Sequence, residues 1–314
     1  KGILAADEST PTCTKRFDSI NTESTDESRN FYRNMLFTSD NIAEYISGVI
    51  LFDETFHQKE LKTDTLFPQY LESKNILPGI KVDSGLRSFN DHPEEKVTVG
   101  LDGLDEKLSR YYSLGARFAK WRAVIALGDG IPSDGCILAN AEGLAKYALL
   151  CQQANLVPIV EPEVLMDGNH TIDTSFDVTD RTLSTVFNQL EKHNVDLQGI
   201  VLKPNMVLSG YNCENQASVE EVAQKTLKCL TKNVPSKVPG IAFLSGGQSD
   251  ELATLHLNEI NKHDTNWNVT FSYGRALQQS ALKIWAGKSE NAKAAQETLL
   301  SRAKSNSLAS TASL

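Results

Sequence analysis

The sequence has few cysteines and histidines, and neither type is grouped. Its five cysteines form no CxxC pair, and scattered thiols of odd number are typical of unbridged cysteine in a reducing compartment. Its six histidines show neither HxH nor HExxH spacing, the patterns that bring imidazoles to one metal ion. We therefore expect no disulfides and no metal cofactor, and we predict a cytoplasmic protein.

The chain also lacks long apolar runs and an excess of positive charge. No run approaches the roughly 18 residues of a membrane span, and no signal-peptide pattern is found at the start. The formal net charge is −9, which argues against a basic stripe for nucleic acid or a membrane surface. We expect a soluble protein with neither partner, in which local positive charge meets any anionic ligand.

What the sequence does contain is a series of short, apolar, β-branched runs, each typical of a strand buried on both faces. Helical patterns lie between them, such as the apolar stripe of residues 183–190 behind a predicted cap at Thr179 or Asp180. The polar segments 84–95 and 126–135 are predicted as loops. The runs begin at Gly2, Ile46, Gly79, Ala116, Leu156, Gly199, Gly240 and Asn268.

Strands that alternate with helices in this way predict the α/β class and a (β/α)8 TIM barrel of one domain. By length alone, two domains would also fit 314 residues. A doubly wound sheet is the alternative, but it would usually carry GxGxxG after its first strand, and that motif is absent. We predict the barrel over residues 1–300 and the start of a flexible, small and polar tail over residues 301–314.

Polar residues gather where the predicted strands end, which in a parallel barrel is where active sites lie. Residues two apart point to the same face of a strand, so each pair of this spacing is expected to face one mouth. Lys203 ends the sixth run. The pairs are Asp7 and Ser9, Lys81 and Asp83, Lys120 and Arg122, and Glu161 and Glu163.

Lys203 has two interpretations. Its stem could be buried with the ammonium in water, or its amine could form a Schiff base with a substrate carbonyl. At an ordinary pKa, only about 1 in 2,500 lysines is neutral at pH 7. Burial and a second cation such as Lys120 would lower that pKa, so lysines on several strand ends make a reactive amine plausible.

The glutamates of VEPEV, Glu161 and Glu163, are either a solvated rim or proton carriers for a Schiff-base reaction. We expect crowded carboxylates and ammoniums to shift each other's pKa values toward neutrality.

Glycine turns follow the last two predicted strands. SGGQSDE and YGRAL could be ordinary turns, but backbone N–H groups there can also hold a phosphate, as barrels often do after strands seven and eight. The candidate groups are Ser245, Gly246, Gly247, Gly274 and Arg275. Because Lys81, Arg122, Lys15 and Arg16 are available elsewhere, we expect a ligand with phosphate at both ends.

Seven stretches occur in the order LAADEST, GIKVD, GARFAKWR, VPIVEPE, LKPNM, FLSGGQS and FSYGRALQ. Together they closely resemble class I fructose-bisphosphate aldolase, from Gly2 to about residue 308. The resemblance implies a metal-free barrel enzyme, normally a homotetramer. Such enzymes reversibly cleave fructose 1,6-bisphosphate into dihydroxyacetone phosphate and glyceraldehyde 3-phosphate in glycolysis and gluconeogenesis. Some members have secondary cytoskeletal partners.

The resemblance also implies roles for individual residues. Lys203 would form the Schiff base, and Glu161, Glu163 and Lys120 would transfer protons. Asp7 would orient Lys203 and the substrate hydroxyls. The phosphate on carbon one would be held by Ser245, Gly246, Gly274 and Arg275, and the other phosphate by Lys81, Arg122 and Ser9, with Lys15 and Arg16 nearby.

The sequence departs from the family pattern in several places. Pro11 and Thr12 stand where the family usually has Gly-Ser, and Ser84 replaces a lysine. The family has a C-terminal tyrosine that assists proton transfer at carbon three, and this sequence stops at Leu314 without it. The N-terminal helix that the resemblance implies before the first run is missing too. If that ending is natural, enamine protonation should be slow while the Schiff base still forms. A targeting peptide could lie in the missing N-terminal segment.

Two other functions remain open at this point. Another Schiff-base lyase or transaldolase on a barrel is disfavoured by the two phosphate sites. A non-catalytic scaffold of the aldolase fold is disfavoured by the intact lysine and carboxylates. Histidine spacing disfavours a zinc-dependent aldolase, and the choice between fructose 1,6-bisphosphate and fructose 1-phosphate stays open.

Overall fold

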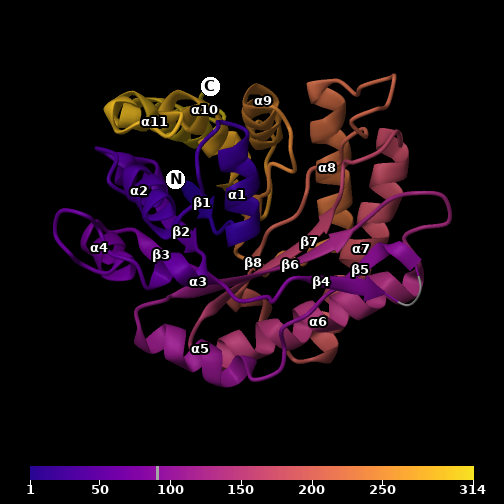
Figure 1. Cartoon of the computed structure of the whole chain (residues 1–314). Helices are drawn as coiled ribbons and strands as arrows, with labels where there is room; N and C mark the ends of the chain where they lie inside the picture. Colours follow the sequence, from indigo (N-terminus) through magenta and orange to yellow (C-terminus); the bar gives the residue numbers. More distant parts are fainter. Residues whose placement is uncertain (90–91) are drawn as a thin grey trace.

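The computed structural model describes residues 1–89 and 92–314, and a closed barrel of parallel strands forms its centre (Figure 1). Around the barrel the strands follow the order β1, β10, β9, β8, β7, β6, β3, β2. Each strand run predicted from the sequence is present, so the (β/α)8 barrel is confirmed. The strands are β1 Gly2–Ala6, β2 Ile46–Leu51, β3 Leu77–Lys81, β6 Phe118–Ile125, β7 Val157–Val164, β8 Val201–Leu202, β9 Gly240–Phe243 and β10 Asn268–Tyr273.

Helices surround the barrel, and most begin just after a strand has ended at the mouth (Figure 1). Several are fixed there by a side-chain oxygen that accepts a hydrogen bond from the first turn, as Ser133, Ser218 and Ser249 do. No described helix is long and apolar enough to span a membrane. The helices are α1 Thr10–Asp18, α2 Asp26–Phe37, α3 Asp53–Phe56, α4 Phe67–Ser73, α5 Leu104–Ser113, α6 Asp134–Gln153, α7 Ile172–Lys192, α8 Val219–Asn233, α9 Asp250–Asn261, α10 Arg275–Trp285 and α11 Ala292–Ala309, with short 3-10 turns at Ile42–Glu44, Leu197–Gly199 and Ser289–Asn291.

A small apolar cluster closes the barrel below the mouth. It contains Ala5, Phe118 and Ile159, with Val201 packed against it. Each of these lies two residues before a polar residue of the mouth. The apolar cluster and the polar residues above it therefore lie on the same face of each strand. A Cβ atom at Gly79 would clash with the Phe118 ring. Glycine on the neighbouring strand is therefore what lets Phe118 fill the barrel.

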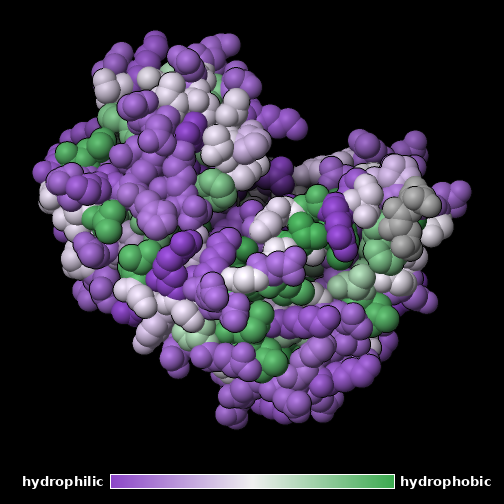
Figure 2. Space-filling model, turned by 60° about the horizontal axis from the view of Figure 1, so that its bottom comes forward, coloured by the Kyte–Doolittle hydropathy of each residue, from purple (hydrophilic) through white to green (hydrophobic). Residues whose placement is uncertain are grey.

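The opposite face of the strands packs against the helices and forms the main core. On β6, Trp121 is buried and stacks on Tyr147 of α6, with ring centroids 5.5 Å apart. Burial of such a side chain stabilises the fold by roughly 1.5–3 kcal/mol. The outer surface seen in Figure 2 is mostly hydrophilic, with hydrophobic residues scattered over it.

The segment predicted as a polar loop at residues 84–95 differs from the prediction. It forms an antiparallel pair, β4 Leu86–Phe89 and β5 His92–Thr98, and residues 90 and 91 lie outside the described residues. Strand β4 is largely solvent-exposed and β5 is mostly polar, so neither shows the alternating apolar pattern that reveals a strand. The Thr98 N–H donates to Asn140 Oδ1 at 3.2 Å, which ties this hairpin to α6. The predicted loop at 126–135 is largely present, and α6 begins at Asp134.

Two helices extend further than expected. Helix α7 begins at Ile172, capped by Thr171 rather than by Thr179 or Asp180, because the Thr171 hydroxyl accepts from the Thr174 N–H. Residues 301–309, expected to begin a flexible tail, lie in α11, which packs beside α9 and α10. The Thr254 hydroxyl donates to buried Asn306 at 2.8 Å, and small residues on α11 allow this close packing.

Candidate active site

The strand ends form one cavity of about 740 Å³ at the mouth of the barrel. Apart from Gly247, every site residue predicted from the sequence lines it. These residues come from β1, β3, β6, β7, the segment after β8, the turns after β9 and β10, and helices α1 and α10. They are Asp7, Ser9, Lys15, Arg16, Lys81, Lys120, Arg122, Glu161, Glu163, Lys203, Ser245, Gly246, Gly274 and Arg275.

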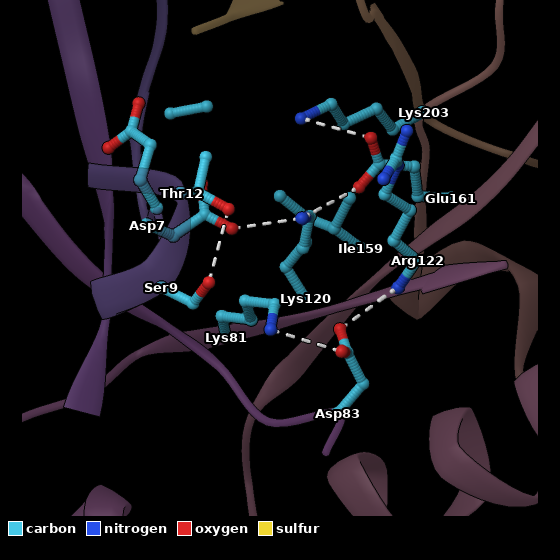
Figure 3. Close-up of polar contacts among 12 residues, drawn as sticks. Asp7, Ser9, Thr12, Lys81, Asp83, Lys120, Arg122, Ile159, Glu161 and Lys203 are labelled. Atoms are coloured by element: carbon cyan, nitrogen blue, oxygen red, sulfur yellow. Dashed lines mark hydrogen bonds and ion pairs between the residues drawn. The ribbon is translucent and has the colours of Figure 1, made fainter. Parts of the chain in front are cut away.

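A chain of buried charges crosses the bottom of the cavity (Figure 3). Lys203 Nζ lies 3.4 Å from Glu161 Oε1, and Lys120 Nζ lies 3.1 Å from Glu161 Oε2. Lys120 also donates to Asp7 Oδ2 at 2.9 Å. Each of these residues is less than 9% exposed. Two ammoniums thus share two carboxylates in a poorly solvated place, where charge interactions are strong. We call these four residues the charged floor.

Lys203 is the member of the charged floor whose acidity is best suited to nucleophilic attack. Burial lowers its pKa, the Glu161 carboxylate opposes that effect, and the Lys120 ammonium reinforces it. A lower pKa enlarges the neutral, nucleophilic fraction of the amine. The backbone from which this side chain extends is fixed, because the Lys203 main-chain N–H donates to Val160 O of β7 at 2.8 Å.

Lys120 and Asp7 do not follow the expected shift toward neutrality. Burial would lower the pKa of Lys120, but Asp7 and Glu161 outweigh it and raise that pKa. Burial would raise the pKa of Asp7, but Lys120 and Lys203 lower it to about 2. Opposite charges favour each other's ionised forms, so this pair stays charged over the working range of pH. The prediction that all these pKa values shift toward neutrality is therefore wrong for Lys120 and Asp7. Of the three residues, only Lys203 has a pKa shifted in that direction.

One end of the cavity is built mainly from backbone. We call Ser245, Gly246, Gly274 and Arg275 the glycine cradle. Residues Gly246 and Gly247 have φ values of +58° and +85°, so the turn after β9 needs glycine at both positions. Gly274 then precedes α10, whose first N–H groups have no side-chain cap. Such a helix start, with Arg275 on its first turn, is suited to an anion.

The remaining groups of the cavity are mostly side-chain cations. We call Ser9, Lys15, Arg16, Lys81 and Arg122 the basic rim. Most of its cations already have carboxylate partners: Arg16 pairs with Glu8, Lys81 lies 3.1 Å from Asp83, and Arg122 pairs closely with Glu163. Burial would lower the pKa of Arg122, but Glu163 outweighs it and raises that pKa. Ser9 Oγ lies 3.1 Å from the Thr12 hydroxyl.

Sequence reasoning had not assigned the partners of the basic rim. Glu8 and Asp83 both line the cavity, and Glu8 also accepts from the buried Gln278 amide at 2.9 Å. Both lie within or beside motifs already singled out, since Asp83 follows Lys81 by two residues. That spacing was the signal that could have paired Asp83 with Lys81.

Within residues 1–89 and 92–314, no group of three or more histidine, cysteine, aspartate or glutamate side chains is arranged to hold a metal ion.

Comparison with known proteins gives a consistent result. Residues 1–314 match the family described as "Glycolytic: Fructose-bisphosphate aldolase class-I". The chain is 53% identical to a probable fructose-bisphosphate aldolase class 1 of Xanthomonas campestris pv. campestris, over 98% of this chain and 93% of that one. It is 50% identical to the cytosolic fructose-bisphosphate aldolase 4 of Arabidopsis thaliana, over 98% of this chain and 78% of that protein.

A solved structure is also similar throughout. It is the fructose-bisphosphate aldolase of Plasmodium falciparum, in complex with TRAP and a small-molecule inhibitor. The TM-score is 0.97 at 50% identity, and the match covers 100% of this chain and 91% of that one. The fold, the lysine-bearing cavity and these relatives agree, and the chain belongs to the class I fructose-bisphosphate aldolase family.

Proposed function

We propose that Lys203 forms an imine with fructose 1,6-bisphosphate, and that this chain thereby cleaves the sugar reversibly into dihydroxyacetone phosphate and glyceraldehyde 3-phosphate. The observation that carries the proposal is the 3.4 Å approach of Lys203 Nζ to Glu161 at the bottom of a cavity with anion-binding groups at both ends. A buried amine of lowered pKa beside a carboxylate is the arrangement that carbonyl attack requires.

The reaction begins when the neutral Lys203 amine attacks carbon two of the open-chain sugar and forms a carbinolamine. Protonation of the carbinolamine hydroxyl releases water and leaves a protonated imine. The bond between carbons three and four then breaks as Glu161 takes the proton of the carbon-four hydroxyl. The electron pair of the broken bond moves into the iminium and gives an enamine. Glyceraldehyde 3-phosphate then leaves first. The enamine takes a proton at carbon three, and water hydrolyses the imine to release dihydroxyacetone phosphate.

The other members of the charged floor support these steps. Lys120 keeps its proton because its pKa is raised, so it can hold a developing negative charge and supply a proton beside Glu161. Asp7 fixes Lys120 through the 2.9 Å hydrogen bond and orients the substrate hydroxyls. Glu163 is the second proton carrier, and it is free to act when a phosphate replaces it as partner of Arg122.

The phosphates would be held at the two ends of the cavity. The glycine cradle takes the phosphate on carbon one, through backbone N–H groups and the Arg275 guanidinium. The basic rim takes the phosphate on carbon six, through Lys81, Arg122 and Ser9, with Lys15 and Arg16 close by.

Less direct features complete the proposal. The enzyme works without a metal, resides in the cytoplasm and assembles as a homotetramer. A cytosolic relative supports the location. Secondary protein partners, including cytoskeletal ones, are in keeping with a relative whose structure contains the partner protein TRAP. Light scattering of the purified chain tests the assembly, with an expected mass four times 34.5 kDa.

The decisive experiment is borohydride reduction in the presence of dihydroxyacetone phosphate, followed by peptide mass mapping, with and without EDTA. We expect one stable adduct on Lys203, equal in both arms. The variant Lys203→Met should lose the adduct and at least about 10⁴-fold in cleavage rate. Lys283→Met, a matched change of an exposed lysine on α10, should keep both. An adduct on another lysine, or on none, would contradict the proposal, and loss of activity with EDTA would contradict its metal-free form.

A further inference from the structure

A tyrosine that neither the sequence motifs nor the mechanism uses lies against the glycine cradle. Tyr211 is in the segment after Lys203, and its hydroxyl donates to Gly246 O at 3.1 Å. A Cβ atom at Gly247 would overlap the Tyr211 hydroxyl oxygen and would lie 3.1 Å from Arg275 Nη2. The hydroxyl and the guanidinium therefore lie on the same side of Gly247, next to the turn that would hold a phosphate.

The backbone that carries Tyr211 is held by a second loop. The Tyr211 N–H donates to Met166 O, the N–H of Gly210 to His170 O and the N–H of Asn212 to Gly168 O, each at 2.9 Å. A Cβ atom at Gly210 would clash with Gly168 O, so the two loops are in close contact. Three consecutive backbone bonds fix the direction in which the Tyr211 side chain leaves the chain. The ring reaches the glycine cradle from a rigid support, although 45% of the residue is exposed.

The chemistry of a phenol suits a link between the two halves of the cradle. A tyrosine hydroxyl has one proton to donate and two lone pairs to accept with. The proton is used on Gly246 O, which leaves the lone pairs for the Arg275 guanidinium beside it. Burial raises the pKa of Tyr211 against the opposing charge of Arg275, so the hydroxyl keeps its proton at neutral pH.

We propose that Tyr211 is a positioning residue for the phosphate on carbon one: its hydroxyl joins the Gly246 turn to Arg275 and holds both in the geometry that binds the phosphate. The inference rests on the proposed function, since it assumes that the glycine cradle receives the phosphate of the ketone half. It adds a residue that selects ligands phosphorylated at this end over the same ligands without phosphate.

The test compares two ligands that differ by one phosphate. Imine formation is followed by borohydride trapping on Lys203 as a function of dihydroxyacetone phosphate, and separately of unphosphorylated dihydroxyacetone. In Tyr211→Phe we expect the half-saturating concentration of dihydroxyacetone phosphate to rise about five- to tenfold, as for loss of one ordinary hydrogen bond. That of dihydroxyacetone should stay unchanged. KM for fructose 1,6-bisphosphate should rise by a similar factor, with kcat within twofold.

The matched control is Tyr112→Phe, which removes the hydroxyl of another partly exposed tyrosine, on α5 and outside the cavity. It should change neither ligand's trapping. Equal effects of Tyr211→Phe on both ligands, or no effect on either, would overturn the role of Tyr211 while wild-type trapping on Lys203 left the proposed function intact. Failure of the wild-type chain to trap dihydroxyacetone phosphate would instead overturn the proposed function, and the inference with it.

Discussion

After β9 and β10 the proposed phosphate groups are turns and a helix start, whereas those on α1, β3 and β6 are mostly side chains already engaged with carboxylates. The glycine cradle takes its shape from positive φ angles at Gly246 and Gly247 and is complete before a ligand arrives. The basic rim has to exchange partners, since Glu8, Asp83 and Glu163 occupy its cations. A preformed site loses less binding free energy to reorganisation than one that must first release ion pairs.

The difference suggests a division of labour between the ends. In the proposed mechanism the ketone half, which stays attached to Lys203 after cleavage, would be held by the preformed glycine cradle. The aldehyde half, which leaves first, would be held by the basic rim, where carboxylates compete for the same cations. We infer that tight holding and ready release are assigned to different ends by the choice between backbone and side-chain ligands.

The strongest break in this comparison is Arg275→Ala. Within the described residues Arg275 forms no salt bridge, so its charge is fully available to the phosphate. We expect KM for fructose 1,6-bisphosphate to rise about 100-fold, in line with loss of a charge-assisted contact of roughly 3 kcal/mol. Steady-state kinetics gives the value. A KM change below fivefold would mean that the cradle binds through backbone alone.

Acid pH probes the charged floor between the two ends. The pKa of Asp7 is lowered to about 2 in the folded chain, from an ordinary 3.8. A lowered folded-state pKa contributes stability above pH 4, here about 2 kcal/mol, which is lost as the pH falls from 4 toward 2. The difference in unfolding free energy between wild type and Asp7→Asn should therefore shrink by that amount between pH 5 and pH 2. Denaturant titrations at each pH measure it, and a constant difference would rule out the ionised Asp7.

Lys81→Met sharpens the contrast from the side of the basic rim. We expect about a tenfold loss of kcat/KM on fructose 1,6-bisphosphate. On fructose 1-phosphate we expect little change, because it has no phosphate on carbon six to bind Lys81. The control is Asp83→Asn, which releases Lys81 from its 3.1 Å partner. That variant should move the other way, toward about two- to threefold tighter binding of the bisphosphate. If both variants weaken binding equally, the carboxylate is part of the site and not a competitor.

The fold was largely predictable because its signals are strong. Buried strands such as the one from Gly240 are continuous apolar runs, and the polar ends of the strands fall at one mouth by the rules of parallel barrels. The hairpin of β4 and β5 was not predictable, since neither strand carries an alternating apolar pattern. The true start of α7 depends on a cap at Thr171, whereas the prediction placed the cap at Thr179 or Asp180, inside the helix.

The site shows the same limit. Strand periodicity brings Lys120, Glu161 and Lys203 together, because each lies at a fixed spacing from a buried run. Periodicity places Asp83 on the same face of its strand as Lys81, but the pairing of Arg16 with Glu8, eight residues apart, appears only in three dimensions. Tyr211 had no signal in the sequence, since it belongs to an irregular segment. The loop of residues 166–170 holds that segment beside the glycine cradle.

The alternation along β6 carries a consequence for how this barrel can change in evolution. Lys120 points into the mouth above Phe118, while the next residue, Trp121, packs outward on Tyr147. Residues that serve the site and residues that pack against the helices therefore alternate along this one strand. Insertion of a single residue before Lys120 would exchange the two, placing an ammonium in the helix layer and an indole in the mouth. Lineages of this barrel are therefore free to vary loop lengths but are confined to steps of two within the strands.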